Sequence, residues 1–141
     1  MSQEAFTQVI AELQSLTTPG DTQIMTFNTS ALYDGATSVT PKFAAIDAAT
    51  SGDNTLVAAV TDKKIRVLSA FMISAGTVNA RFESGAGGTA KTGQMNLVAN
   101  SGFVLPFNPI GWFETAASAL LNLELSGAVS VDGALTYVEV N

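Results

Sequence analysis

The sequence predicts a mainly β protein: an antiparallel β-sandwich of the jelly-roll type, in one domain, with a short N-terminal helix or arm. From about Gln23 onward, apolar and polar residues alternate with the period of two that is typical of strands. The predicted strands, about eight or nine in number, recur roughly every ten residues without helical stretches between them. We therefore expect residues 1–22 to form the helix or arm and residues 23–141 to form the sandwich.

The first sixteen residues carry the only convincing helical pattern. Ser2 can cap the N-terminus of this helix, and Thr17–Gly20 ends it. A helix this short is marginally stable in water, so its apolar stripe must pack against the protein's own sheet or against a neighbouring subunit. From this stripe, the candidate subunit or capsid contacts are Phe6, Ile10 and Leu13.

The segment between the helix and residue 54 is predicted to be largely extended. Pro41 cannot donate a backbone hydrogen bond, so the strand around it should lie at the edge of a sheet. In order, we expect a strand at Gln23–Asn28, a polar turn region at Thr29–Thr37, an extended run at Val39–Asp47 and a loop at Ala48–Gly52.

Residues 54–83 predict three consecutive strands joined as hairpins, with the middle strand at residues 64–74. The middle strand is apolar on both faces, because one face would hold Ile65, Val67, Phe71 and Ile73 and the other Leu68, Ala70 and Met72. Its neighbour at residues 77–83 alternates cleanly, with Val78, Ala80 and Phe82 inward. Something must cover the second apolar face, either the N-terminal helix or another subunit, so Leu68, Ala70 and Met72 are candidate subunit or capsid contacts.

Further strands are predicted in the C-terminal half. In Leu121–Ser126 the three leucines at alternate positions should face the core, while Asn122, Glu124 and Ser126 face outward. The remaining strands are expected at Gln94–Ala99, Phe103–Leu105 and Ala134–Val140.

The composition excludes several classes of function. The chain has no cysteine and no histidine, which excludes disulfides, thiolate or imidazole metal ligands and Ser-His-Asp catalysis. A net charge of −6 disfavours nucleic acid and anionic membranes as partners. Only 13% of the residues are charged, which leaves little charge to coat a lone monomer. We see no signal peptide and no apolar run near the ~20 residues of a transmembrane helix.

Two patterns come close to chemical motifs. Gly85–Thr92 differs from a phosphate-binding P-loop by one residue, Ala90, but no helical pattern follows it, so we interpret it as a glycine-rich strand connection. The carboxylates are spread singly; two could meet across a sheet as an acid–base pair, although solvated positions are the simpler interpretation. We predict no catalytic residue, no cofactor and no metal.

The segment Leu105–Thr115 contains the only tryptophan. Trp112 could be a platform for a ligand such as a sugar ring. The simpler interpretation is a proline-shaped crossing whose aromatic residues pin one sheet to the other or fill a subunit contact. Trp112 and Phe113 are therefore also candidate contact residues.

Five segments together point to a known group of proteins: Lys63–Val67, Gly85–Gly93, Asn108–Thr115, Ala119–Leu123 and Gly133–Val138. In these segments the chain resembles small virion proteins of tailed bacteriophages, most nearly the head decoration or cement proteins. The resemblance implies a jelly-roll-like domain that trimerises and sits on the major capsid protein, bracing the joints between capsomers. It also implies that the N-terminal arm could reach the capsid or a neighbour.

We therefore expect a noncatalytic virion structural protein, made in the host cytoplasm and located on the capsid surface. Its expected partners are copies of itself, as a homotrimer, and the major capsid protein, with no nucleic acid and no membrane. The alternative is a carbohydrate-binding or tail/fibre-type β-sandwich module with its site at Trp112. A third class is a hydrolase built on paired carboxylates.

Overall fold

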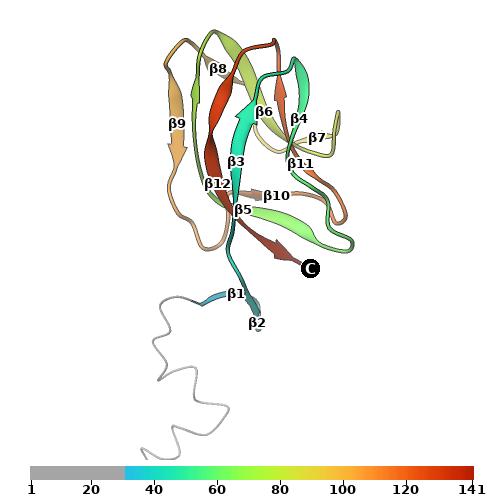
Figure 1. The fold of residues 1–141 in the computed structure, drawn as a ribbon. Coiled ribbons are helices and arrows are strands. Elements are labelled where there is room, and N and C mark those ends of the chain that lie inside the picture. Colours follow the sequence, from blue (N-terminus) through green and yellow to red (C-terminus); the bar gives the residue numbers. More distant parts are fainter. Residues whose placement is uncertain (1–30) are drawn as a thin grey trace, which may run out of the picture. The chain divides into compact units, whose positions relative to one another are not determined.

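The computed structural model describes residues 31–141, which form twelve β-strands and contain no helix (Figure 1). The prediction of a mainly β fold is confirmed, and the predicted N-terminal helix and the strand at Gln23–Asn28 lie outside the described residues. The strands are β1 (Leu32–Asp34), β2 (Thr37–Val39), β3 (Lys42–Ala48), β4 (Gly52–Val57), β5 (Lys64–Ser74), β6 (Val78–Ser84), β7 (Thr89–Ala90), β8 (Met95–Leu97), β9 (Gly102–Leu105), β10 (Phe113–Glu114), β11 (Leu121–Leu125) and β12 (Val131–Val140).

Ten of these strands build two antiparallel five-stranded sheets, and β1 and β2 form a separate hairpin. The β12 sheet has the order β10-β5-β12-β3, and β9 also pairs with β5. The β11 sheet has the order β4-β11-β6-β7, and β8 also pairs with β6. The core lies between the two sheets, where alternate residues of both are fully buried, among them Ile46, Ile65, Phe82 and Leu123.

The connectivity is that of a jelly roll. The antiparallel pairs are nested along the chain: β3 pairs with β12, β4 with β11, β5 with β9 and β10, and β6 with β8. Successive pairs lie alternately in the β12 sheet and in the β11 sheet. A long antiparallel ribbon is thus wrapped around one core, and β12 and β11 close the wrap by pairing with β5 and β6.

The predicted hairpins of residues 54–83 are wrong, although the strands themselves are present. β5 lies in the β12 sheet, whereas β4 and β6 lie in the β11 sheet, so the connections on either side of β5 cross from one sheet to the other. All three strands contribute apolar residues to the shared core. They pair with β11 and β12, which come much later in the sequence, and β5 and β6 also pair with the shorter strands β7 to β10.

A β-bulge in β5 explains why that strand is apolar on both faces in the sequence. Ser69 pairs with Thr136 and Val67 pairs with Tyr137, so Leu68 is one extra residue without a partner on β12. The bulge shifts the alternation by one position. Ile65 and Val67 face the core before the bulge, and Ala70 and Met72 face the core after it.

Other segments differ from the prediction in smaller ways. The polar turn region expected at Thr29–Thr37 contains strand β1, which pairs with β2 around a turn at Gly35. Asn122 lies on the outer face as predicted, and it is fully buried there beside Asp53 and Glu83. The edge position predicted from Pro41 is confirmed, since β3 is the last strand of its sheet.

Candidate interaction surface

The outer face of the β12 sheet, which points away from the core, is divided into two halves. In one half, Leu68, Val138 and Val140 form a small buried cluster. The β1–β2 hairpin covers this cluster with Leu32 and Val39. The bulge makes this packing possible, because it turns Leu68 out of the main core and toward the hairpin.

Arg66 fastens the hairpin to the sheet. Its Nη1 atom lies 2.9 Å from Oδ1 of Asp34 on β1, and its Nε atom lies 2.9 Å from Oε2 of Glu114 on β10. Partial burial alone would lower the pKa of Arg66, but the hydrogen bonds to Glu114 and Asp34 outweigh burial and raise that pKa. One guanidinium therefore joins three strands on the outer face.

The other half of the outer face, which we call the open face, has no such cover among the described residues. Its large side chains are strongly exposed: Phe43 79%, Phe71 53%, Ile73 57% and Val104 71%. The pairing register places Val104, Phe71, Ala134 and Ala45 in one row across four strands, with Phe43 in the next row and Ile73 in the row on the other side. Four neighbouring strands therefore present a contiguous apolar surface to solvent.

The same pairing register determines the size and the charge of the side chains on and around the open face. The small side chains of Ala45 and Ala134 lie side by side in the row of Phe71, and Phe43 lies in the next row, where it pairs with Thr136. Asp47 and Asp132 oppose each other in the row of Ile73 and border one end of the face. The residues that define the open face are all uncharged, so an apolar partner loses no ion pair by covering them.

A second apolar surface is the loop between β9 and β10, which we call the knob. Its members are Pro106, Phe107, Pro109, Ile110 and Trp112, and the exposed fractions of Phe107, Ile110 and Trp112 are 58%, 81% and 45%. At each end the knob is hydrogen-bonded to β5, from the amide of Asn108 to the carbonyl of Leu68 and from the amide of Trp112 to the carbonyl of Val67.

Internal hydrogen bonds hold the knob in one shape. The side chain of Asn108 accepts a bond from the amide of Ile110 at 3.0 Å and donates one to the carbonyl of Gly111 at 3.1 Å. Nε1 of Trp112 donates to the carbonyl of Pro106 at 2.8 Å. Gly111 has a positive φ of 93° and packs against Arg66. The knob is therefore preorganised for contact, which lowers the entropy lost when a partner binds.

The predicted contact residues fall into three groups. Leu68, Ala70 and Met72 are buried by this chain itself, so the prediction that they form a surface for another subunit is wrong. The bulge places Ala70 and Met72 in the main core, and the hairpin covers Leu68. Phe6, Ile10 and Leu13 lie outside the described residues.

Trp112 and Phe113 are adjacent in the sequence but have different surroundings. Phe113 packs against Phe82 of the opposite sheet, with ring centroids 5.0 Å apart, and so pins the two sheets together as the simpler interpretation predicted. Trp112 remains partly exposed in the knob beside a hollow of ≈310 Å³ that Arg66, Ile110 and Glu114 help to line.

Phe43 and Val104 were not among the predicted contact residues. Phe43 stood in a run that was predicted to be an edge strand, and Val104 stood in a short strand with no assigned face. Phe71 and Ile73 were recognised as apolar, but the bulge decides which face of β5 they occupy. A search for large apolar residues at alternate positions of these strands would have flagged all four.

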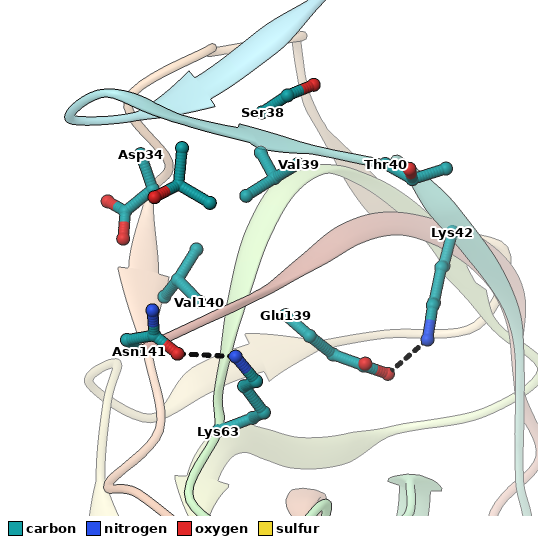
Figure 2. A pocket seen from close by; sticks show the side chains of 10 residues that line it. Asp34, Ser38, Val39, Thr40, Lys42, Lys63, Glu139, Val140 and Asn141 are labelled. Carbon is teal, nitrogen blue, oxygen red and sulfur yellow. Dashed lines mark hydrogen bonds and ion pairs between the residues drawn. The ribbon is translucent and has the colours of Figure 1, made fainter.

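A pocket of ≈250 Å³ lies between the β1–β2 hairpin and the end of β12 (Figure 2). Nζ of Lys42 lies 2.6 Å from Oε1 of Glu139. Figure 2 shows this ion pair and the hydrogen bond from Lys63 to the side chain of Asn141. The hydrogen bond to Glu139 raises the pKa of Lys42 above its ordinary value. Both ammonium groups are thus engaged within the pocket, where they tie β3 and the start of β5 to β12.

The outer face of the β11 sheet is polar. The side-chain amide of Asn122 donates to Oδ1 of Asp53 at 2.6 Å and to Oε2 of Glu83 at 3.3 Å. Nε of Arg81 lies 2.7 Å from Oε1 of the fully buried Glu83 and also contacts Glu124. Asn122 thus bridges the carboxylates of Asp53 and Glu83, and Arg81 pairs with Glu83, as in a structural network.

The glycine-rich segment has the predicted role of a strand connection. Gly85–Gly88 turns the chain from β6 into β7, which pairs back onto β6, and the amide of Gly87 donates to Asp53. Within residues 31–141 no group of three or more acidic side chains is placed to hold a metal ion. None of the described segments is a helix with the length and apolarity needed to cross a membrane.

The two apolar surfaces are therefore the most distinctive features of the described residues, and they suit binding to another protein. Comparison with known proteins gives no further guidance, because no family model, no curated protein and no solved structure matches this chain.

Proposed function

We propose that this chain is a noncatalytic virion structural protein that decorates and stabilises a phage capsid, binding the major capsid protein as a homo-oligomer, most simply a homotrimer. The observation that carries the proposal is the open face, a contiguous apolar surface over four strands. A surface of this kind marks a protein–protein contact in soluble domains. The jelly roll, a fold that recurs among viral capsid domains, and the resemblance of the sequence to decoration proteins add support.

The low charge of the chain supports the same function. With 13% charged residues, a monomer would have few charges to keep its apolar surfaces apart in solution. On a capsid the partner is present in many symmetric copies, so weak individual contacts add up through avidity. The described residues would act there through shape and buried area, without a chemical step.

The proposal is tested by mixing the purified protein with empty expanded phage heads, then measuring cosedimentation and the heat resistance of the heads. Decoration predicts saturable binding in a fixed ratio to the capsid subunits and a higher disruption temperature. Phe43→Asp adds a charge on the open face and is the test variant. Ala86→Asp adds the same charge on the exposed β6–β7 turn and is its control. If heads from candidate hosts neither bind the protein nor gain heat resistance, decoration is wrong.

A second candidate function rests on Trp112. Its partly exposed indole borders a hollow of ≈310 Å³ together with Arg66 and Glu114, an arrangement that suits stacking and hydrogen bonding of a sugar ring. A carbohydrate-binding or tail/fibre-type module would bind on a glycan array, and Trp112→Ala would abolish binding while the fold is retained. Binding that survives this substitution would place any glycan site elsewhere.

A further inference from the structure

The open face ends in two acidic side chains that lie directly opposite each other. Asp47 on β3 pairs with Asp132 on β12, and Ile73 lies in the same row on β5. Both aspartates are exposed, and neither forms an ion pair with another residue of the described part of the chain. Like charges in directly opposed positions of neighbouring strands repel each other and destabilise a sheet. The pair therefore lowers the stability of the free protein, and a cation supplied by a partner would relieve the repulsion.

The apolar rows beside the acidic pair fix where the rest of such a partner would lie. Along β3, Ala45 is two residues from Asp47, and Phe43 is four residues from it. Ala45 stands in the row of Phe71. Because a strand rises about 3.3 Å per residue, the two rows lie about 7 Å and about 13 Å from the acidic pair. An extended segment offers this spacing at positions i, i+2 and i+4, and a helix, rising about 1.5 Å per residue, offers a similar one at i, i+4 and i+8. One short segment can therefore place a cation on the pair and apolar side chains on both rows.

The cations of this chain are poorly placed to fill that role. The chain has 6 lysines and arginines, and all of them lie within residues 31–141. Contacts between described residues engage Lys42 with Glu139, Lys63 with Asn141, Lys64 and Arg66 with Glu114, and Arg81 with Glu83. The remaining one, Lys91, stands in a run of small and polar residues from Gly85 to Gln94. A second copy would therefore have to give up one of these contacts to fill the open face, and residues 1–30 carry no lysine or arginine.

We propose that the open face binds a segment of a different protein in which a lysine or arginine is accompanied by large apolar side chains at this spacing. The inference rests on the proposed function and deepens it, because it names the chemistry of the capsid segment that the open face recognises. The cation lies between the carboxylates of Asp47 and Asp132, and the apolar side chains pack on Phe71 and Phe43. Burial of the apolar rows supplies most of the affinity, whereas the ion pair at the rim supplies selectivity for the partner and faster association.

Selection from a library of random dodecapeptides displayed on yeast tests this recognition without any phage component. The full chain, labelled in solution, selects the binders. Peptides that bind the Phe71→Asp variant equally well are discarded, because that substitution disables the open face at a position that is 53% exposed. We expect the enriched peptides to carry a lysine or arginine with large apolar residues two and four, or four and eight, positions away.

Matched variants then locate the cation, with a synthetic copy of an enriched peptide as the probe and calorimetry as the measure of Kd. Asp47→Asn and Ala86→Lys each raise the net charge by one, but only the first changes the open face. Both positions are exposed, so the fold should survive, as circular dichroism and thermal melting would check. Asp47→Asn should weaken peptide binding about 3-fold and the double variant Asp47→Asn/Asp132→Asn about 10-fold, whereas Ala86→Lys should change it by less than about twofold at physiological salt. Replacement of the peptide's cation by alanine should weaken binding to the unmodified chain about 10-fold and have little further effect on the double variant.

Three peptide results would overturn the inference: enriched peptides without a cation, peptides that bind the double variant as tightly as the unmodified chain, or a library in which none prefers the unmodified chain to Phe71→Asp. Self-association of the unmodified protein that Phe71→Asp abolishes, measured by sedimentation equilibrium, would also overturn it, by assigning the open face to a second copy. Failure of the proposed function gives a different pattern. Cation-bearing peptides without any binding of phage heads leave the recognition standing, whereas heads that bind the double variant undiminished leave decoration standing and remove the role of the two aspartates.

Discussion

Truncation of Leu68 to alanine tests whether the bulge of β5 and the β1–β2 hairpin form one packed unit within the chain. Leu68 is fully buried, and its neighbours are Val138 and Val140 with Leu32 and Val39 of the hairpin above them. Loss of three buried carbon groups at about 0.8 kcal/mol each removes about 2.4 kcal/mol of transfer free energy. A residual cavity would add to this cost, within the ~2–5 kcal/mol range of Leu→Ala substitutions in cores.

We expect a total near the low end of that range, about 2.5–3 kcal/mol. The two hairpin strands are only three residues long, so the hairpin can shift and fill part of the cavity. Leu123→Ala is the control in the main core. Leu123 lies on β11, which pairs with β4 on one side and with β6 on the other, so its surroundings relax less. That variant should lose about 3–5 kcal/mol.

Urea unfolding of both variants at two protein concentrations measures the free energies, and amide hydrogen exchange reports on the hairpin. Leu68→Ala should lose stability equally at both concentrations, because the contact lies within one chain. It should also lose protection in the β1–β2 pairs Leu32–Val39 and Tyr33–Ser38. A loss below about 1 kcal/mol, or a loss that disappears at high protein concentration, would refute the intramolecular cover of Leu68.

Three further substitutions test the packing and the polar contacts. Gly133→Ala should lower the free energy of unfolding in urea by about 1–3 kcal/mol or more, because its Cβ would lie 1.9 Å from the carbonyl oxygen of Phe71. The control Gly93→Ala has open space and should stay within about 0.5 kcal/mol, so equal effects would contradict the close approach of β12 to β5. Asn122→Ala should cost about 1–3 kcal/mol of unfolding free energy by the same assay, because it removes the amide between Asp53 and Glu83. Asn96→Ala, at an exposed position of β8, is its control, and a neutral Asn122→Ala would mean that the network contributes nothing to stability. Glu139 raises the pKa of Lys42, so their pair stabilises the fold below the ordinary lysine pKa of about 10.4 and ceases to do so as the pH rises through the raised pKa. Thermal melts from neutral to strongly alkaline pH should therefore show Glu139→Gln to be less stable than the unmodified protein only at the lower pH values. A difference that persists unchanged at high pH would disprove this linkage.

The local pattern of apolar residues was sufficient to predict most strands and many of their inner faces. Val78, Ala80 and Phe82 face the core as the alternation of their segment predicts, and the leucines of β11 do the same. This succeeds because the side chains of a strand alternate between two faces whatever its neighbours are. Phe113 was likewise predicted as a possible pin between the sheets, where it packs on Phe82.

The sequence by itself thus determined the period, the approximate strand positions, the jelly-roll class and the absence of histidine and cysteine chemistry. Only the tertiary structure decided which strands pair, because β3 with β12 and β4 with β11 are contacts between distant segments that no local period encodes. It also decided the bulge at Leu68, which depends on the register against β12. That one extra residue places Ala70 and Met72 in the core, Leu68 beneath the hairpin, and Phe71 and Ile73 on the open face.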